Sequence, residues 1–196
     1  MRLFERTFEI TNRTRVLDVG GSPDIWETAS VAPQVTILNL PSALGPQRPG
    51  LLAVAGDGRM LPFADKSFDI VFSNSVIEHV GTLADQRRFS DEIARVGRQY
   101  WVQTPNRHFP VELHVMLPFI HFFPKPVQRS VVRRFTLWQY ATHPTPDVRR
   151  DYIHHFLNEL NLLDTPALQA LFPGARIISE RVLGMPKSLI AVQTQS

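Results

Sequence analysis

The chain of 196 residues contains no cysteine. This absence excludes a disulfide-stapled fold, a thiolate nucleophile and a zinc site built on cysteine. No apolar run reaches the roughly 20 residues that a membrane-spanning helix needs. The first ten residues carry Arg2, Glu5, Arg6 and Glu9, so they lack the uninterrupted apolar stretch of a secretory signal. We therefore expect a cytoplasmic protein without a transmembrane segment.

Lysine is scarce as well: three lysines stand beside 18 arginines, and the net charge at pH 7 is only +3. Seven basic residues and only two acids lie between residues 107 and 150, interleaved with proline and phenylalanine. So long a segment after a core strand is typical of a functional lid. The length of the chain suits one domain, and we expect a single domain over 1–196 with a lid or acceptor-binding insertion at 107–150.

Short β-rich runs alternate with helical or loop segments, which is typical of a parallel sheet covered on both faces. The runs are RVLDV at 15–19, QVTILNL at 34–40, LLAVAG at 51–56, FDIVFS at 68–73 and QYWVQT at 99–104. The spacing of Phe89, Ile93 and Val96 predicts a helix over 84–98. Two further runs on either side of Met185 and Pro186 predict a terminal hairpin. The sequence thus indicates an α/β fold with an antiparallel edge.

The ends of these strands carry groups suited to a nucleoside cofactor. Ligands of open parallel sheets bind at the carboxyl ends of the strands, and the first strand ends there in Asp18, Gly20 and Gly21. Asp57 follows the third strand as an acceptor for an exocyclic amine. We expect an apolar slot for the base and further polar groups from the fourth strand at the same edge. The slot residues are Met60, Leu61 and Phe63, and the polar residues are Ser73, Asn74, Glu78 and His79.

Together, VLDVGGSPD at 16–24 and GDGRMLPFADKSFDIVFSNSVIEHV at 56–80 resemble the class I S-adenosylmethionine (SAM) dependent methyltransferases of the type 11 subgroup. The resemblance implies a Rossmann-like, seven-stranded, mostly parallel sheet of order 3-2-1-4-5-7-6, with helices on both faces and an insertion after strand 5. It implies SAM as the cofactor. The residues implied to bind it are Asp18, Gly20, Gly21, Asn39, Asp57, Gly58, Arg59, Met60 and Ser73.

Two departures from the family pattern concern the ribose. Asn39 stands where an acidic residue usually closes the second strand, and Ser22 and Asp24 replace later glycines of the first motif. An asparagine still hydrogen-bonds a hydroxyl, so we expect rearranged ribose contacts and retained binding.

Glu78 and His79 are the candidate catalytic residues, because a base at the end of the fourth strand faces the methyl donor. The alternative is that Glu78 caps backbone groups and His79 only lines the pocket. Some related methyltransferases bind magnesium through ExxEH at this place, where Ser75 here replaces the first acid. The resemblance therefore leaves open a Mg²⁺ ion held by Glu78, His79 and His114, with Glu112 beside them.

The segment YWVQTPNRHFPVELH at 100–114 resembles bacterial methyltransferases of polysaccharide and glycolipid pathways, among them the sugar O-methyltransferases of mycobacterial polymethylated polysaccharides. Planar hydrogen-bonding groups suit a sugar, and a turn shaped by prolines is the alternative. The candidate acceptor-binding residues are Asn106, Arg107, His108, Glu112, His114 and His143. The leading function is methylation of a hydroxyl on a sugar or glycan precursor.

Other readings stay open at this point. The same motifs occur in methyltransferases of quinone or lipid precursors, and a non-catalytic SAM-binding protein is a further alternative. A helix at 127–140 with Val127, Val131, Phe135 and Trp138 on one stripe would rest on a membrane surface, cover the site or pack on its own domain. A nucleic-acid partner is not expected, since no RNA-binding module is found. The oligomeric state is left open.

Overall fold

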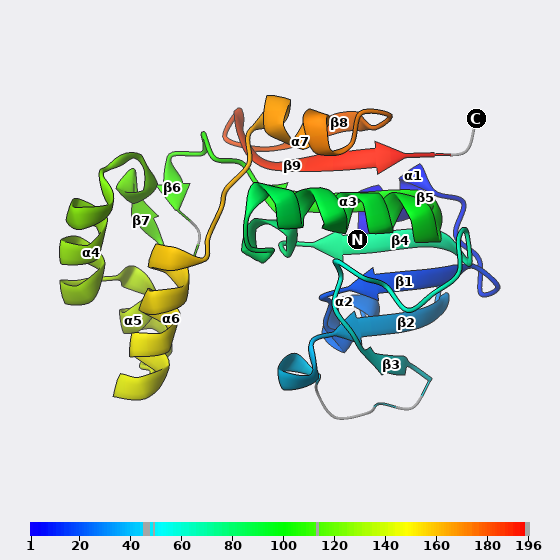
Figure 1. Ribbon diagram of the computed structural model, residues 1–196, viewed down its shortest axis with the longest axis horizontal. Coiled ribbons are helices and arrows are strands. Elements are labelled where there is room, and N and C mark those ends of the chain that lie inside the picture. The colour runs from blue at the N-terminus through cyan, green and yellow to red at the C-terminus, as the bar shows by residue number, and fades with distance from the viewer. Residues whose placement is uncertain (45–47, 49, 113, 195–196) are drawn as a thin grey trace.

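The structure is a computed structural model that describes residues 1–44, 48, 50–112 and 114–194. Its centre is a seven-stranded sheet of order β3-β2-β1-β4-β5-β9-β8, in which β1 to β5 run parallel and β9 is antiparallel to both its neighbours (Figure 1). The predicted order is confirmed. The strands are β1 (Arg15–Val19), β2 (Gln34–Asn39), β3 (Leu52–Ala55), β4 (Phe68–Asn74), β5 (Gly97–Pro105), β8 (Arg176–Val182) and β9 (Met185–Gln193).

Helices cover both faces of the sheet, and the side chains of each strand alternate between the two faces. In β4, Val71 packs against α3 (Leu83–Val96) and α7 (Thr165–Leu171), while Ile70 and Phe72 point to the other face. There they meet an aromatic cluster with α1 (Arg2–Thr7) and α2 (Pro23–Trp26). The near-continuous apolar strands of the sequence are explained by this double coverage.

Helix α3 begins and ends close to the predicted bounds. A capping box holds its first turn, since Thr82 and Asp85 exchange side-chain-to-backbone hydrogen bonds. Phe89, Ile93 and Val96 are buried as predicted. The terminal hairpin β8–β9 is also present, and Gly184 at its turn adopts φ +80°, a left-handed conformation that favours glycine.

Residues between β5 and α7 form a lobe beside the carboxyl ends of the parallel strands (Figure 1). This lobe has a small apolar core of its own, centred on Val115, Val132 and Phe156. Helix α6 continues beyond the predicted bound at residue 150. The elements of the lobe are β6 (Val111–Glu112), β7 (Leu117–Pro118), η3 (Ile120–Phe122), α4 (Lys125–Arg134), α5 (Leu137–Thr142) and α6 (Pro146–Asn158).

The single helix predicted over 127–140 is wrong. Phe135 is extended and ends α4, and the Thr136 hydroxyl then accepts from Gln139 N to begin α5. The buried face is also displaced by one residue: Gln128 and Val132 point inward, whereas Val127 and Val131 are exposed. The Gln128 amide donates to Phe123 O at 2.8 Å, which allows a polar residue to take the inner face.

No helix within the described parts of the chain is both long and apolar enough to cross a membrane.

Candidate active site

A cavity of about 380 Å³ opens at the carboxyl ends of β1, β2 and β4. This is where the strand order reverses, since the chain moves outward from β1 to β3 and then returns to place β4 on the other side of β1. The cavity is lined by Val19, Gly20, Leu38, Asn39, Leu40, Ala43, Gly56, Asp57, Gly58, Arg59, Ser75, Val76, His79, Val80, Gly81 and Phe89.

The turn after β1 requires glycine for steric reasons. Gly20 has φ +78°, and a Cβ added there would lie 2.5 Å from Val76 Cγ2. A Cβ on Gly21 would lie 1.8 Å from Asp18 Oδ2. Any side chain at either position would collide with its neighbours, so the backbone of this turn can lie against a ligand.

Asp18 lies behind this turn and outside the cavity lining. Alternation along β1 directs its side chain to the face that carries α2, where Trp26 Nε1 donates to Oδ2 at 2.7 Å. The other oxygen, Oδ1, has no hydrogen-bond partner among the described residues. Burial raises the pKa of Asp18 to about 7, and the Trp26 hydrogen bond opposes that rise. Asp18 is therefore not among the residues that line the cavity, and its contact with a cofactor stays a prediction.

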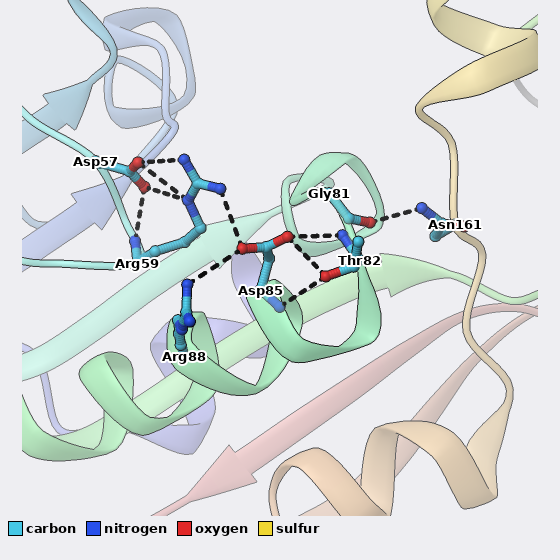
Figure 2. A network of polar contacts seen from close by, with 7 residues as sticks. All are labelled: Asp57, Arg59, Gly81, Thr82, Asp85, Arg88 and Asn161. Carbon is cyan, nitrogen blue, oxygen red and sulfur yellow. Dashed lines mark hydrogen bonds and ion pairs between the residues drawn. The ribbon is translucent and has the colours of Figure 1, made fainter.

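Two polar groups at the cavity suit the nucleoside of a cofactor. Asn39 donates from Nδ2 to Gly21 O at 2.9 Å, which leaves its amide oxygen as an acceptor at the end of β2. Asp57 forms a salt bridge with Arg59, whose Nη2 donates to Oδ2 at 2.6 Å (Figure 2). The hydrogen bonds from Arg59 lower the pKa of Asp57. A carboxylate offers about four lone-pair sites, and the backbone N–H, Nε and Nη2 of Arg59 occupy about three of them, which leaves about one for an exocyclic amine.

The same arginine ties the cavity to helix α3. Arg59 Nη1 lies 3.2 Å from Asp85 Oδ1, and Asp85 also takes part in the capping box with Thr82 (Figure 2). On the far side, Asn161 Nδ2 donates to Gly81 O at 2.7 Å. The cavity rim is thus linked by a hydrogen bond to the last part of the lobe.

None of the three residues predicted to form an apolar slot for adenine lines the cavity. Met60 is 78% exposed and lies outside the cavity lining, Leu61 is buried in the core, and Phe63 packs on Phe68 with ring centroids 5.0 Å apart. Ser73 is fully buried and donates to Val19 O at 3.0 Å. Leu61, Phe63 and Ser73 thus serve packing and hydrogen bonding within the protein, whereas Met60 is exposed to solvent.

The apolar lining comes from other elements. It includes Leu38, Leu40, Ala43, Val80 and Phe89, none of which was predicted from the sequence to line the site. The signal for two of them was present, since Leu38 and Leu40 flank Asn39 at the end of a predicted strand.

A cluster of polar side chains lies beside the cavity, after the end of β4. His79 lines the cavity, while its neighbour Glu78 on the short turn η2 (Ile77–His79) is fully buried. Glu78 Oε2 accepts from Thr104 Oγ1 at 2.9 Å, and Oε1 has no hydrogen-bond partner among the described residues. Burial raises the pKa of Glu78 to about 7.

The lobe contributes the other half of this cluster. His114 Nε2 lies 3.2 Å from His79 Nε2, and His114 Nδ1 lies 2.6 Å from Glu112 Oε1. Glu112 Oε2 accepts from Val115 N at 2.9 Å, which holds the carboxylate in place. Burial lowers the pKa of His114, but the hydrogen bond and charge of Glu112 outweigh it and leave the pKa above its ordinary value.

The remaining predicted acceptor residues lie elsewhere. Asn106 is buried and donates to Pro186 O, and its side-chain oxygen accepts from His108 N. Arg107 lines a separate cavity of about 240 Å³. His108 is exposed and lies 3.8 Å from Asp164, and His143 is an exposed C-cap of α5 with φ 47°. Among the predicted acceptor residues, contacts to the cluster are seen for Glu112 and His114.

Comparison with known proteins defines the class of this fold. Residues 31–99 match the family described as "Methyltransferase domain". This segment contains β2, β3, β4 and α3, and the sheet order around it is that of the class I methyltransferase fold.

A curated relative is also described as a methyltransferase. A protein of Mycolicibacterium vanbaalenii, described as an uncharacterized methyltransferase, is 37% identical over 92 residues, which cover 42% of this chain and 34% of that protein. The match thus spans about a third of the relative's length.

Two solved structures share the fold. A SAM-dependent methyltransferase from Methanosarcina mazei is 14% identical with a TM-score of 0.55, covering 93% of this chain and 92% of that one. A structure from Rhodobacter sphaeroides, described as a candidate zinc-dependent alcohol dehydrogenase, is 12% identical with a TM-score of 0.64, covering 97% and 86%.

Proposed function

We propose that the chain is a SAM-dependent O-methyltransferase whose acceptor is a hydroxyl of a sugar or glycan precursor. The observation that carries this proposal is the position of His79, which lines the cavity and contacts His114, which in turn contacts Glu112. The match to the methyltransferase domain family supports the cofactor. The polar cluster supports an acceptor that must lose a proton.

In this proposal SAM occupies the cavity of about 380 Å³, a volume within the usual range of ligand sites. Asp57 accepts from the adenine amine, and Asn39 meets the ribose hydroxyls. The glycine turn lies against the methionine part, which directs the sulfonium toward His79.

The reaction is an in-line displacement. The acceptor oxygen forms a bond to the methyl carbon as the carbon–sulfur bond breaks, and the electron pair of that bond goes to sulfur, which leaves as neutral S-adenosylhomocysteine. The hydroxyl proton passes to the cluster that begins at His79. Positioning supplies much of the rate, and removal of the proton adds roughly 10²- to 10⁴-fold for a poor nucleophile such as an alkyl hydroxyl.

A lipophilic acceptor is a second candidate, and the surface of the lobe favours it. Phe119, Phe122 and Phe123 are all about half exposed, and Val127 and Val131 on α4 are exposed too. Exposed aromatic and aliphatic side chains of this kind are common on surfaces that contact lipid or another apolar partner. Peripheral contact with a membrane that carries such an acceptor belongs to this alternative.

Methyl transfer from labelled SAM to monosaccharides, glycolipid precursors and quinone precursors tests both candidates. We expect labelled sugar product, and an activity about 10²-fold or more lower in His79→Ala with unchanged affinity for S-adenosylhomocysteine. His154→Ala is the matched control, because His154 is an exposed histidine on α6. Absence of cofactor binding at millimolar concentration in calorimetry would overturn the proposal, and product from lipophilic acceptors alone would select the second candidate.

A further inference from the structure

We infer that Glu78, His79 and His114 form a binding site for a divalent ion of the first transition series at the acceptor end of the cavity. Only the role of the ion rests on the proposed function. One ligand atom from each of the three side chains lies within 4.8 Å of the others. The ligands come from two parts of the chain, η2 and the lobe, so an ion would join the lobe to the sheet.

The distance between the two imidazoles fits a shared ion. Two nitrogens that each lie 2.0–2.1 Å from one ion at a tetrahedral angle are about 3.3 Å apart. His79 Nε2 and His114 Nε2 are 3.2 Å apart. Glu78 Oε1 lies 4.0 Å from His79 Nε2, and the three ligand atoms lie within 4.8 Å of one another, so the carboxylate must approach by about 0.5 to 1.5 Å to share the ion.

Glu78 supplies an independent observation. Its side chain is fully buried, and Oε1 has no hydrogen-bond partner among the described residues although Oε2 is held by Thr104. A buried carboxylate oxygen without a partner is costly, and coordination to a cation removes that cost. This oxygen lies on the side of Glu78 that faces His79.

The surroundings of His114 match those of a metal-bound histidine. Such histidines usually donate their second ring N–H to a carboxylate, which orients the ring and leaves the other nitrogen with its lone pair. His114 Nδ1 meets Glu112 Oε1 at 2.6 Å, and Val115 N holds the other Glu112 oxygen. Glu112 is therefore a positioning residue for His114.

The donor set selects the kind of ion. Mg²⁺ prefers oxygen ligands, whereas two imidazoles and one carboxylate suit ions such as Zn²⁺, Mn²⁺, Fe²⁺ or Co²⁺. The magnesium left open by the sequence is thus the less suitable choice. Three protein ligands would leave a coordination position for a further ligand, and the cavity lies beside His79. With the ion bound, an acceptor hydroxyl held at that position would have a lower pKa and would release its proton to solvent in place of His79, because His79 Nε2 would be a ligand of the ion.

The test is metal binding by the full chain after exhaustive chelation. Cobalt(II) is titrated by visible absorption, and Zn²⁺ and Mg²⁺ are titrated by calorimetry. We expect one equivalent of Co²⁺ with a low-symmetry visible band, and one equivalent of Zn²⁺ bound far more tightly than Mg²⁺. His114→Ala should lower the Zn²⁺ affinity by at least about 10²-fold, Glu112→Gln by about 10- to 100-fold, and His154→Ala not at all.

Retention of wild-type Zn²⁺ affinity in His114→Ala overturns the inference, as does a preference for Mg²⁺ over Zn²⁺. Circular dichroism checks that each variant is folded, and if His114→Ala does not fold, the milder Glu112→Gln decides by the same readout. S-adenosylhomocysteine binding is measured on the same samples. Cofactor binding without Zn²⁺ binding removes the metal site alone, whereas Zn²⁺ binding without cofactor binding removes the proposed function alone.

Discussion

Trp26 donates its indole N–H to Asp18 at 2.7 Å on the face of the sheet that carries α1 and α2. The carboxyl group is completely buried, and its second oxygen has no partner among the described residues. Within the described part of the chain, this carboxyl group accepts from one indole and pairs with no cation, so burial favours its neutral form. The first motif of the chain thus contains a group that titrates close to neutral pH.

Asp18→Asn tests this titration. The pKa of Asp18 is raised from 3.8 to about 7, so the folded state binds the proton more tightly than the unfolded chain. The contribution of Asp18 to the stability of the wild type is then greatest below about pH 4 and falls as the pH rises toward 7. The asparagine keeps an acceptor for Trp26 and does not titrate.

We therefore expect the variant to gain stability relative to the wild type between pH 4 and pH 8, by at most about 4 kcal/mol. Urea unfolding at several pH values measures the difference. Burial also raises the pKa of Glu78 to about 7, but Glu78 is present in both proteins and cancels in the comparison. A difference that stays constant with pH would count against the buried neutral carboxyl.

Comparison of Gly20→Ala with Gly184→Ala distinguishes the cost of a strained backbone conformation from the cost of a steric clash. Both glycines have φ near +80°, but a Cβ on Gly184 meets nothing within 4 Å, whereas one on Gly20 meets Val76 at 2.5 Å. Gly184→Ala should cost about 1 to 2 kcal/mol from its conformation alone. Gly20→Ala should cost about 1 to 3 kcal/mol more and weaken cofactor binding. Equal losses of stability would show that Val76 yields freely.

Asp57→Ala should lower the affinity for S-adenosylhomocysteine by about 10- to 100-fold, because a hydrogen bond to a charged acceptor is worth about 1.5 to 3 kcal/mol. The matched control is Asp65→Ala, which also removes an arginine partner, Arg95, but lies outside the cavity lining. Calorimetry measures both affinities. Similar affinities in the two variants would exclude Asp57 from the cofactor site.

Leu40→Ala and Met60→Ala compare two exposed apolar side chains. Leu40 lines the cavity and is 52% exposed, whereas Met60 is 78% exposed and lies outside it. We expect Leu40→Ala to weaken S-adenosylhomocysteine binding about three- to tenfold and Met60→Ala to leave it unchanged, since only the first removes apolar surface that a ligand would cover. A larger loss in Met60→Ala would restore the slot expected from the sequence.

Val131→Ser and Val132→Ser test which face of α4 is buried. Val132 is completely buried in the core of the lobe, while Val131 is exposed. Val132→Ser should lower the free energy of unfolding by about 2 to 4 kcal/mol, because it removes buried apolar atoms and buries a hydroxyl. Val131→Ser should change it by less than about 0.5 kcal/mol. Thermal or urea unfolding gives the ranking, and the reverse order would restore the predicted stripe.

The sequence predicted the sheet and helix α3 well, because their signals are local. Apolar runs such as RVLDV need two covered faces, and the spacing of Phe89, Ile93 and Val96 fits one helix face. The helix predicted at 127–140 failed for a tertiary reason. Gln128 and Val131 are three residues apart and lie close together around the helix axis, so helical periodicity alone does not decide which of them is buried. The hydrogen bond from the Gln128 amide to Phe123 O allows Gln128 to face inward.

The residues of the site also fall into two groups: those that local sequence signals predicted, and those that only tertiary packing brings together. The sequence by itself determined the glycine turn, Asn39 and Asp57, because strand ends and turns place them at one edge of a parallel sheet. It also named Glu78, His79, Glu112 and His114. Only the tertiary structure decided that His79 and His114, 35 residues apart in the chain, stand 3.2 Å apart. The physical reason is that strand ends follow from local periodicity, whereas the contact between the lobe and η2 depends on packing between distant segments.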